Sequence, residues 1–483
     1  PAHCRSRPMN QSLPPPIGAN RVDEPDDQDD GAAMSGASAR IRLIAAALVL
    51  ALAIGAGVIG YRVIAGDEGG SGGGGEVGSW NAIAVQDVED GNITIMDGDG
   101  QELETFEVEG GAGSISSAGP YLLVDNDAPE VIDTRSGDRT ALELNDGENA
   151  RFISPPSPIV ATSSPSGANV RIVDVDSGTE IDVAELGELT GPRIFLESAQ
   201  FDVESGVIGL IDESTSQSVL IDVDGDDDPA FLPGRVVDVA FGRALAVQPA
   251  GPEAELRFYD VNGEELGTID LPALRIAWLV DESTARVVTT GGDLLRVTVA
   301  GDDPEQLASL EMGEDGPAPF IELGEDLERL VFETSDERVV VVDWDGHEIG
   351  QAPGAIIDTA LVSRMAQRCV AVIEADEENP TAPTRLLDAE SGDTVGEPFE
   401  VVRLTPLVGS DDGCTVSTAG TEAPVVVHRD HVTELEVGPA RVSPDGDSVI
   451  VRRDGQNLLQ RASEQDDDPI ELPAGLVVFV DRS

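Results

Sequence analysis

The feature that most constrains this chain is a short pattern that recurs along most of its length. An apolar strand ends in Asp, and a tight turn containing Gly follows. Such turns favour Asp because its side chain accepts hydrogen bonds from nearby backbone N–H groups, and Gly because it tolerates positive φ. Clear copies lie about 40 residues apart, with one interval about twice as long. Their Asp residues are Asp97, Asp133, Asp174, Asp222, Asp260, Asp343 and Asp388.

A second class of turn follows most copies after about 20 residues and leads into another apolar strand. Asp202 to Gly206, Gly409 to Gly413 and Ser443 to Gly446 are examples. Two hairpins per period give four strands, and a four-stranded unit repeated about every 40 residues is typical of a β-propeller. With weaker copies included, ten units are counted, and seven to ten blades are expected. The fold class is therefore all-β, a single propeller of four-stranded blades.

The first unit lacks an inner strand, and the chain has a spare strand at residues 476–480 that could supply it. Pairing the two would close the ring and remove its open edges. We therefore expect the end of this chain to be joined to the start of the repeats.

The turns also carry a resemblance to known families. Ser443-Pro444-Asp445-Gly446 and the D-x-x-S-G turns resemble those of bacterial WD40-like and TolB-type propellers, as a pattern over residues 79–483. The D-x-x-S-G turns resemble quinoprotein propellers too, which place a Trp a few residues after the Gly. No Trp follows Gly137, Gly178 or Gly392, so no quinone cofactor is expected.

Ahead of the repeats lies one strongly apolar stretch. Leu43 to Tyr61 is 19 residues without a charge, and a helix of that length spans roughly the 30 Å hydrocarbon core. Arg40 and Arg42 precede it and Arg62 follows it, which places the N-terminus in the cytoplasm. A cleaved signal peptide is the rival interpretation, but its apolar region is usually shorter, about 7–15 residues. We favour an uncleaved anchor.

The remaining boundaries follow from composition. Residues 1–39 are expected to be a disordered, acidic cytoplasmic tail, because they offer almost no apolar residues for a core. Residues 40–64 contain the transmembrane helix, and residues 65–78 form a Gly-rich linker. Residues 79–483 are the expected extracytoplasmic propeller.

Charge excludes several classes of function. The chain has 29 basic and 93 acidic residues, a net charge of −64, and all of its basic residues are Arg. Without Lys, neither a Schiff-base enzyme nor a phosphate-binding loop of the usual type can be present. A field this negative repels nucleic acid, which needs cationic contacts. A saline habitat and a codon bias toward Arg both explain the composition.

Few residues suggest a chemical site. Asp222, Asp224, Asp226 and Asp228 could bind Ca²⁺, which prefers several oxygen ligands on one loop, although a charged hairpin turn is the simpler interpretation. His428 and His431 are the only close histidine pair, and on one strand they would point to opposite faces. No spacing assembles a catalytic triad, so no catalytic residue is assigned.

Two of the three cysteines are expected to form a disulfide. Cys369 and Cys414 lie in the exported region and open matching strands of consecutive repeats, whereas Cys4 lies in the tail. Matching strands of adjacent blades approach each other only near the propeller axis. The bond would therefore join inner or second strands, and two separate buried thiols are the alternative.

These features predict a membrane-anchored, extracytoplasmic binding or scaffolding module for a protein, peptide or glycan. One alternative is a metal-dependent propeller enzyme of lactonase or hydrolase type, which would need at least three carboxylates converging in the channel. Another is an envelope sensor that reports through the helix. The sequence favours a non-catalytic role and identifies no ligand.

Overall fold

The computed structural model describes residues 79–483 except 146, 154–157, 165–169, 184–198, 203–204, 213–216, 224–228, 251–252, 313–319, 324–327, 358, 361–367, 375–380, 403–406, 411–412, 419–424, 429–430, 435–440, 454 and 463–468. The expected tail, transmembrane helix and linker lie outside the described residues. Within the described ranges, no helix is both long and apolar enough to cross a membrane.

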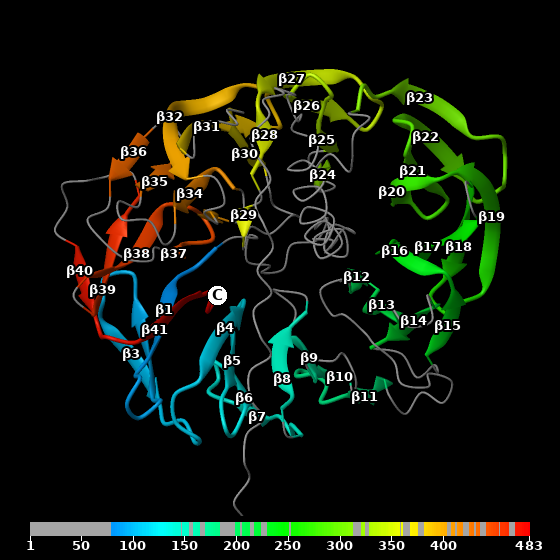
Figure 1. Ribbon diagram of the computed structural model, residues 1–483. Helices are drawn as coiled ribbons and strands as arrows, with labels where there is room; N and C mark the ends of the chain where they lie inside the picture. Colours follow the sequence, from blue (N-terminus) through cyan, green and yellow to red (C-terminus); the bar gives the residue numbers. More distant parts are fainter. Residues whose placement is uncertain are drawn as a thin grey trace, which may run out of the picture. The chain divides into compact units, whose positions relative to one another are not determined.

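The described strands form ten sheets, arranged as the blades of one ring (Figure 1). Named from the inner to the outer strand, the first five blades are blade 1, β41 (Leu476–Val480), β1 (Ala82–Gln86), β2 (Ile93–Asp97) and β3 (Glu102–Phe106); blade 2, β4 (Ser114–Ala118), β5 (Tyr121–Asp125), β6 (Glu130–Asp133) and β7 (Arg139–Ala141); blade 3, β8 (Asn149–Phe152), β9 (Ile159–Ser163), β10 (Arg171–Asp174) and β11 (Glu180–Asp182); blade 4, β12 (Gln200–Asp202), β13 (Val207–Asp212), β14 (Gln217–Asp222) and β15 (Ala230–Pro233); and blade 5, β16 (Arg235–Ala240), β17 (Arg243–Ala250), β18 (Glu253–Asp260) and β19 (Glu265–Pro272).

The other five blades repeat this order. They are blade 6, β20 (Leu274–Asp281), β21 (Thr284–Thr289), β22 (Asp293–Thr298) and β23 (Glu305–Ser309); blade 7, β24 (Phe320–Leu323), β25 (Arg329–Glu333), β26 (Arg338–Asp343) and β27 (Glu348–Pro353); blade 8, β28 (Ala355–Ile356), β30 (Cys369–Ile373), β31 (Thr381–Asp388) and β32 (Thr394–Val402); blade 9, β33 (Leu407–Gly409), β34 (Thr415–Thr418), β35 (Val425–His428) and β36 (His431–Glu434), with β29 (Thr359–Ala360) added inside β33; and blade 10, β37 (Arg441–Val442), β38 (Ser448–Arg453), β39 (Gln456–Arg461) and β40 (Ile470–Leu472). Ten blades exceed the usual four to eight, and the count from the sequence is confirmed.

Blade 1 is built from both ends of the described chain. β41 pairs antiparallel with β1 along its whole length, from Leu476 opposite Gln86 to Val480 opposite Ala82. The inner strand that the first repeat lacks therefore comes from the end of the chain, as its sequence predicts. This pairing closes the ring and leaves no open edge between blade 10 and blade 2.

Second strands such as β1 and β30 are buried on both faces, because both faces of a blade are covered by neighbouring blades. In β1, Ala82 and Ala84 pack toward blade 2, whereas Ile83 and Val85 pack toward blade 10. Ten hydrophobic clusters occur among the described residues, one between each pair of adjacent blades. The core is therefore a ring of ten interfaces, each shared by two blades.

The order of the strands gives the ring two different faces. Turns between the first and second strands, and between the third and fourth strands, lie at one end of the blades, which we call the turn face. Connections between the second and third strands, and from one blade to the next, lie at the opposite end, which we call the loop face. Both classes of turn found in the sequence belong to the turn face.

The repeated Asp residues end the third strands, where they cap the turns. Oδ1 of Asp97 accepts hydrogen bonds from the N–H groups of Asp99 (3.0 Å) and Gln101 (2.8 Å). Asp260 and Asp343 bind their turns through the same two positions. The motif is therefore explained by turn formation, because a side-chain acceptor stabilises the reversal of the chain.

Candidate functional site

Most of the predicted calcium loop lies outside the described residues. Asp222 is described and ends β14, whereas Asp224, Asp226 and Asp228 fall in the gap at 224–228. Elsewhere, over the described part of the chain, no three His, Cys, Asp or Glu residues are grouped so that they could hold a metal ion. Calcium binding at this loop stays a prediction, and the enzyme alternative finds no converging carboxylates in the described residues.

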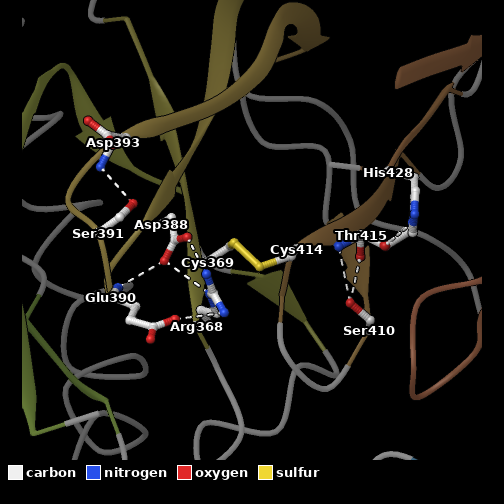
Figure 2. The surroundings of a disulfide bond; sticks show 10 residues. All are labelled: Arg368, Cys369, Asp388, Glu390, Ser391, Asp393, Ser410, Cys414, Thr415 and His428. Carbon is white, nitrogen blue, oxygen red and sulfur yellow. Dashed lines mark hydrogen bonds and ion pairs between the residues drawn. A yellow bond between two sulfur atoms is a disulfide. The ribbon is translucent and has the colours of Figure 1, made fainter. Parts of the chain in front are cut away.

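The predicted disulfide between Cys369 and Cys414 is present, with the two Cα atoms 4.9 Å apart. Cys369 opens β30 and Cys414 immediately precedes β34, so the bond joins the second strands of blades 8 and 9 (Figure 2). The two cysteines are 1% and 7% exposed. This burial within the interface between two blades indicates a structural role.

An ion-pair network lies beside the disulfide. Arg368 binds the carboxylates of Asp388 and Glu390, each at 2.7 Å, on the side of Cys369 shown in Figure 2. Burial alone would raise the pKa of Asp388, but the hydrogen bonds from Arg368 and from the backbone of Glu390 outweigh it and lower that pKa. Asp388 is one of the repeated turn residues, so these ion pairs stabilise a turn of blade 8 next to the disulfide.

The two histidines do not lie on one continuous strand. β35 and β36 form a tight hairpin in which His428 is directly opposite His431. Directly opposite positions share a face of a hairpin, so the expectation of opposite faces is wrong. The cause is the antiparallel pairing of β35 with β36, which places the two histidines on facing strands.

His428 is buried in the wall between blades 9 and 10. Its Nδ1 lies 2.8 Å from Oγ1 of Thr415 and 3.0 Å from the backbone oxygen of Gly446. Thr415 is 2% exposed, so its hydroxyl is not accessible to a substrate. The Thr–His contact lies within blade 9, and the contact of His428 with Gly446 joins that blade to blade 10, so His428 has a structural role here.

A polar hollow of about 560 Å³ opens on the loop face where blades 1 and 2 meet. Its walls are made of Asp90, Asn92, Glu107, Val108, Glu109 and Arg139. Arg139 donates a hydrogen bond to the backbone oxygen of Glu107 (2.7 Å), and the amide of Asn92 donates one to Asp90 (2.9 Å). These hydrogen bonds hold the walls of the hollow in place. The walls carry three carboxylates and one guanidinium group.

One carboxyl group beside this hollow, that of Glu130, is partly withdrawn from water and forms an ion pair with Arg139. Burial raises the pKa of Glu130, although Arg139 opposes that rise. The negative potential around the hollow is thus only partly screened by solvent, and it favours a cationic group.

A further set of carboxylates, which no sequence pattern indicates, joins neighbouring blades. Oε1 of Glu333, at the end of β25 in blade 7, accepts the N–H of Ile356 in blade 8 at 2.6 Å. Oδ2 of Asp238 in blade 5 accepts the N–H of Leu279 in blade 6 at 2.7 Å. Each partner is in another blade, so no local spacing could have revealed these contacts.

Glu333 provides a test of this type of contact. Burial raises its pKa, and the N–H of Ile356 opposes the rise. A raised folded pKa means that the contribution of this group to stability is full below the unfolded pKa and is lost as pH rises through the folded pKa. We expect Glu333→Gln to raise the melting temperature at pH 7, because it keeps the acceptor oxygen and removes the buried charge. The gain should shrink as pH falls toward 4 in a series of thermal melts.

The control for this experiment is Glu89→Gln, which removes one exposed carboxylate from the loop face. Both variants change the net charge equally, so general self-repulsion cancels between them. An equal effect of the two substitutions at all pH values would contradict a special role for Glu333.

Comparison with known proteins identifies no close relative. No protein-family model matches the chain, and no curated protein matches it. Among solved structures, a eukaryotic initiation factor is 13% identical, with a TM-score of 0.47, covering 74% of this chain and 97% of its own. The C-terminal WD40 domain of Sif2 is 13% identical, with a TM-score of 0.38, covering 72% of this chain and 95% of its own.

A third structure is the β-propeller domain of Cps50 (Swd1) from Myceliophteria thermophila. It is 13% identical, with a TM-score of 0.31, and covers 53% of this chain and 92% of its own. Likenesses this remote concern the fold alone. The chain's own ten blades, closed into one ring by the pairing of β1 with β41, make it a β-propeller in fold.

Proposed function

We propose that this protein is a membrane-anchored, extracytoplasmic propeller that binds or scaffolds a cationic protein or peptide. The observation that carries the proposal is the closed ring, which holds a broad loop face with an acidic hollow on a rigid frame. Loops fixed on a rigid scaffold are the usual place for recognition. The described residues include no cluster suited to metal-assisted chemistry.

The compartment is supported by two independent features. The disulfide between Cys369 and Cys414 is of the kind that persists in oxidising environments outside the cytoplasm. The uncharged stretch Leu43 to Tyr61, followed by a glycine linker, has the composition of an anchor and a tether. Together they favour a propeller displayed on the outer side of a membrane.

The chemistry of the partner follows from charge. Removing the six basic and nine acidic residues before position 79 leaves a net charge of −61 on residues 79–483. Such a field accelerates the approach of cationic partners and repels nucleic acid. The three carboxylates of the hollow provide a local contact for a Lys or Arg side chain.

A capture experiment tests this function. Residues 79–483, immobilised and exposed to proteins of the native envelope and of the surrounding medium, should retain a basic protein that high salt releases. A variant with Asp90→Asn, Glu107→Gln and Glu109→Gln should retain much less of it. The matched control, Asp99→Asn, Asp138→Asn and Asp302→Asn, removes the same charge from the turn face and should retain the partner. Equal capture by both variants would place binding elsewhere.

The same charge predicts that salt stabilises the protein. Self-repulsion of −61 charges opposes the compact state, and the Debye length falls from about 30 Å at 0.01 M salt to about 3 Å at 1 M. We expect the melting temperature to rise steadily with NaCl. A melting temperature independent of NaCl would refute this explanation. A larger rise with Ca²⁺ at matched ionic strength would instead indicate specific sites, such as the loop at Asp222.

A further inference from the structure

The N-terminal end of the described chain is fixed to the ring at one point. Ser79 is hydrogen-bonded to Asp481, and the N–H of Asn81 donates to the backbone oxygen of Val480 at 3.1 Å. The side chain of Asn81 accepts the N–H of Arg482 at 2.9 Å. Ser79 therefore cannot move away from the end of β41 without breaking these contacts.

This fixed point lies on the turn face, near the axis of the ring. β1 begins where β41 ends, with Ala82 opposite Val480, which is the turn-face end of blade 1. β41 is the innermost strand of its blade, and Figure 1 marks the C-terminus at the inner side of the ring. Whatever precedes Ser79 thus joins the ring close to the centre of its turn face.

The segment before Ser79 is the glycine-rich stretch Gly66 to Gly78, which has 13 residues. A flexible chain of that length has an r.m.s. span of roughly 20 Å. This distance is similar to the length of a blade strand of five or six residues with its turns, about 20 Å. With a linker this short, the turn face and the loop face lie at very different distances from the point where the linker leaves the membrane.

Charge acts together with the tether. A body with 61 net negative charges is repelled by an anionic membrane surface, and the repulsion extends over about one Debye length, roughly 8–10 Å at 0.1–0.15 M salt. A body that is pushed away but held at one point turns that point toward the surface. Here the point is near the centre of the turn face.

We propose that the full chain holds its turn face toward the membrane and its loop face outward. The docking surface is then the loop face, and its partner is a soluble cationic protein that arrives from the medium and not a component of the same membrane. This proposal depends on the membrane anchor of the proposed function. It adds which face of the ring stays accessible when the chain is anchored.

Fluorescence energy transfer in vesicles tests the orientation. The full chain with Cys4→Ser is given one labelling cysteine, either Glu89→Cys on the loop face or Asp99→Cys on the turn face of blade 1. Both residues are exposed and both substitutions remove one carboxylate. Vesicles of phosphatidylcholine with 30% phosphatidylserine carry a lipid-linked acceptor dye. We expect transfer from the dye at Asp99→Cys to be at least twofold more efficient, and the ratio to fall as NaCl is raised.

A second pair on a distant blade, Thr290→Cys on the loop face and Asp302→Cys on the turn face of blade 6, should give the same ranking. Equal transfer from the two faces would overturn the proposal, and stronger transfer from the loop face would mean that the linker passes through the channel. Flotation of the same samples tests the anchor separately. A chain that does not float with the vesicles overturns both the anchor and the orientation, whereas a floating chain with the wrong ranking overturns the orientation alone.

Discussion

A chain of residues 79–475, which lacks β41, should fail to fold as a stable monomer, whereas residues 79–483 should unfold in one cooperative transition. The deletion removes Val477, Val478, Phe479 and Val480, which are 1% to 7% exposed. Burying such side chains contributes about 1.5–3 kcal/mol each, or about 6–12 kcal/mol together. This equals most of the stability of a typical domain, about 5–15 kcal/mol. Circular dichroism and size-exclusion chromatography would measure the loss.

Two companion samples make the result specific. A chain that ends at Val480 keeps the strand and loses only the contacts of Asp481 and Arg482, so its melting temperature should fall by only a few degrees. A synthetic peptide of residues 474–483, added during refolding of the truncated chain, should restore the ring by pairing with β1. A truncated chain that melts within a few degrees of the intact one would show that closure by β41 is not needed.

The second large effect concerns the disulfide. Replacing both cysteines by Ala frees a loop of 45 residues in the unfolded chain, and the chain-entropy model gives a loss of about 4 kcal/mol. Urea titration should show a lower midpoint with a nearly unchanged slope. Ala is the suitable replacement, because both positions are buried and a hydroxyl would add an unpaired polar group.

Reduction provides the control. A reductant should lower the midpoint of the wild-type protein to about that of Cys369→Ala/Cys414→Ala and should leave the double variant unchanged. Two free thiols in the folded protein, or equal midpoints for the two proteins, would contradict the structural role of the bond.

The sequence predicted the features that depend on local chemistry or on matching positions in the repeat. Asp97 and its six counterparts identify the clear turns because one side chain caps one turn, and adding the weaker copies of the repeat gives the ten blades. Cys369 and Cys414 could be paired because equivalent strands of adjacent blades meet near the axis. Residues 476–480 could be assigned to blade 1 because that blade alone lacked a strand.

Features that depend on contacts between blades were not predicted. β29 is a two-residue strand that leaves blade 8 and pairs in parallel with β33 of blade 9, and two residues are too few to show alternation. Glu333 and Asp238 resemble any other acidic residue in a strand until the next blade is in place. The expectation that His428 and His431 point to opposite faces is wrong because the two residues lie opposite each other on paired strands, which their spacing of three does not reveal.

The joining of β1 to β41 also sets an order of events during biosynthesis. Almost 400 residues separate Gln86 from Leu476, which at about 5–20 residues per second takes roughly 20–80 s to translate. Throughout that interval β1 has already been made, and the edge that will receive β41 has no partner. An unpaired edge of this kind readily pairs with other chains. The nascent ring therefore remains open until β41 has been made, and until then β1 must be kept from pairing with neighbouring chains.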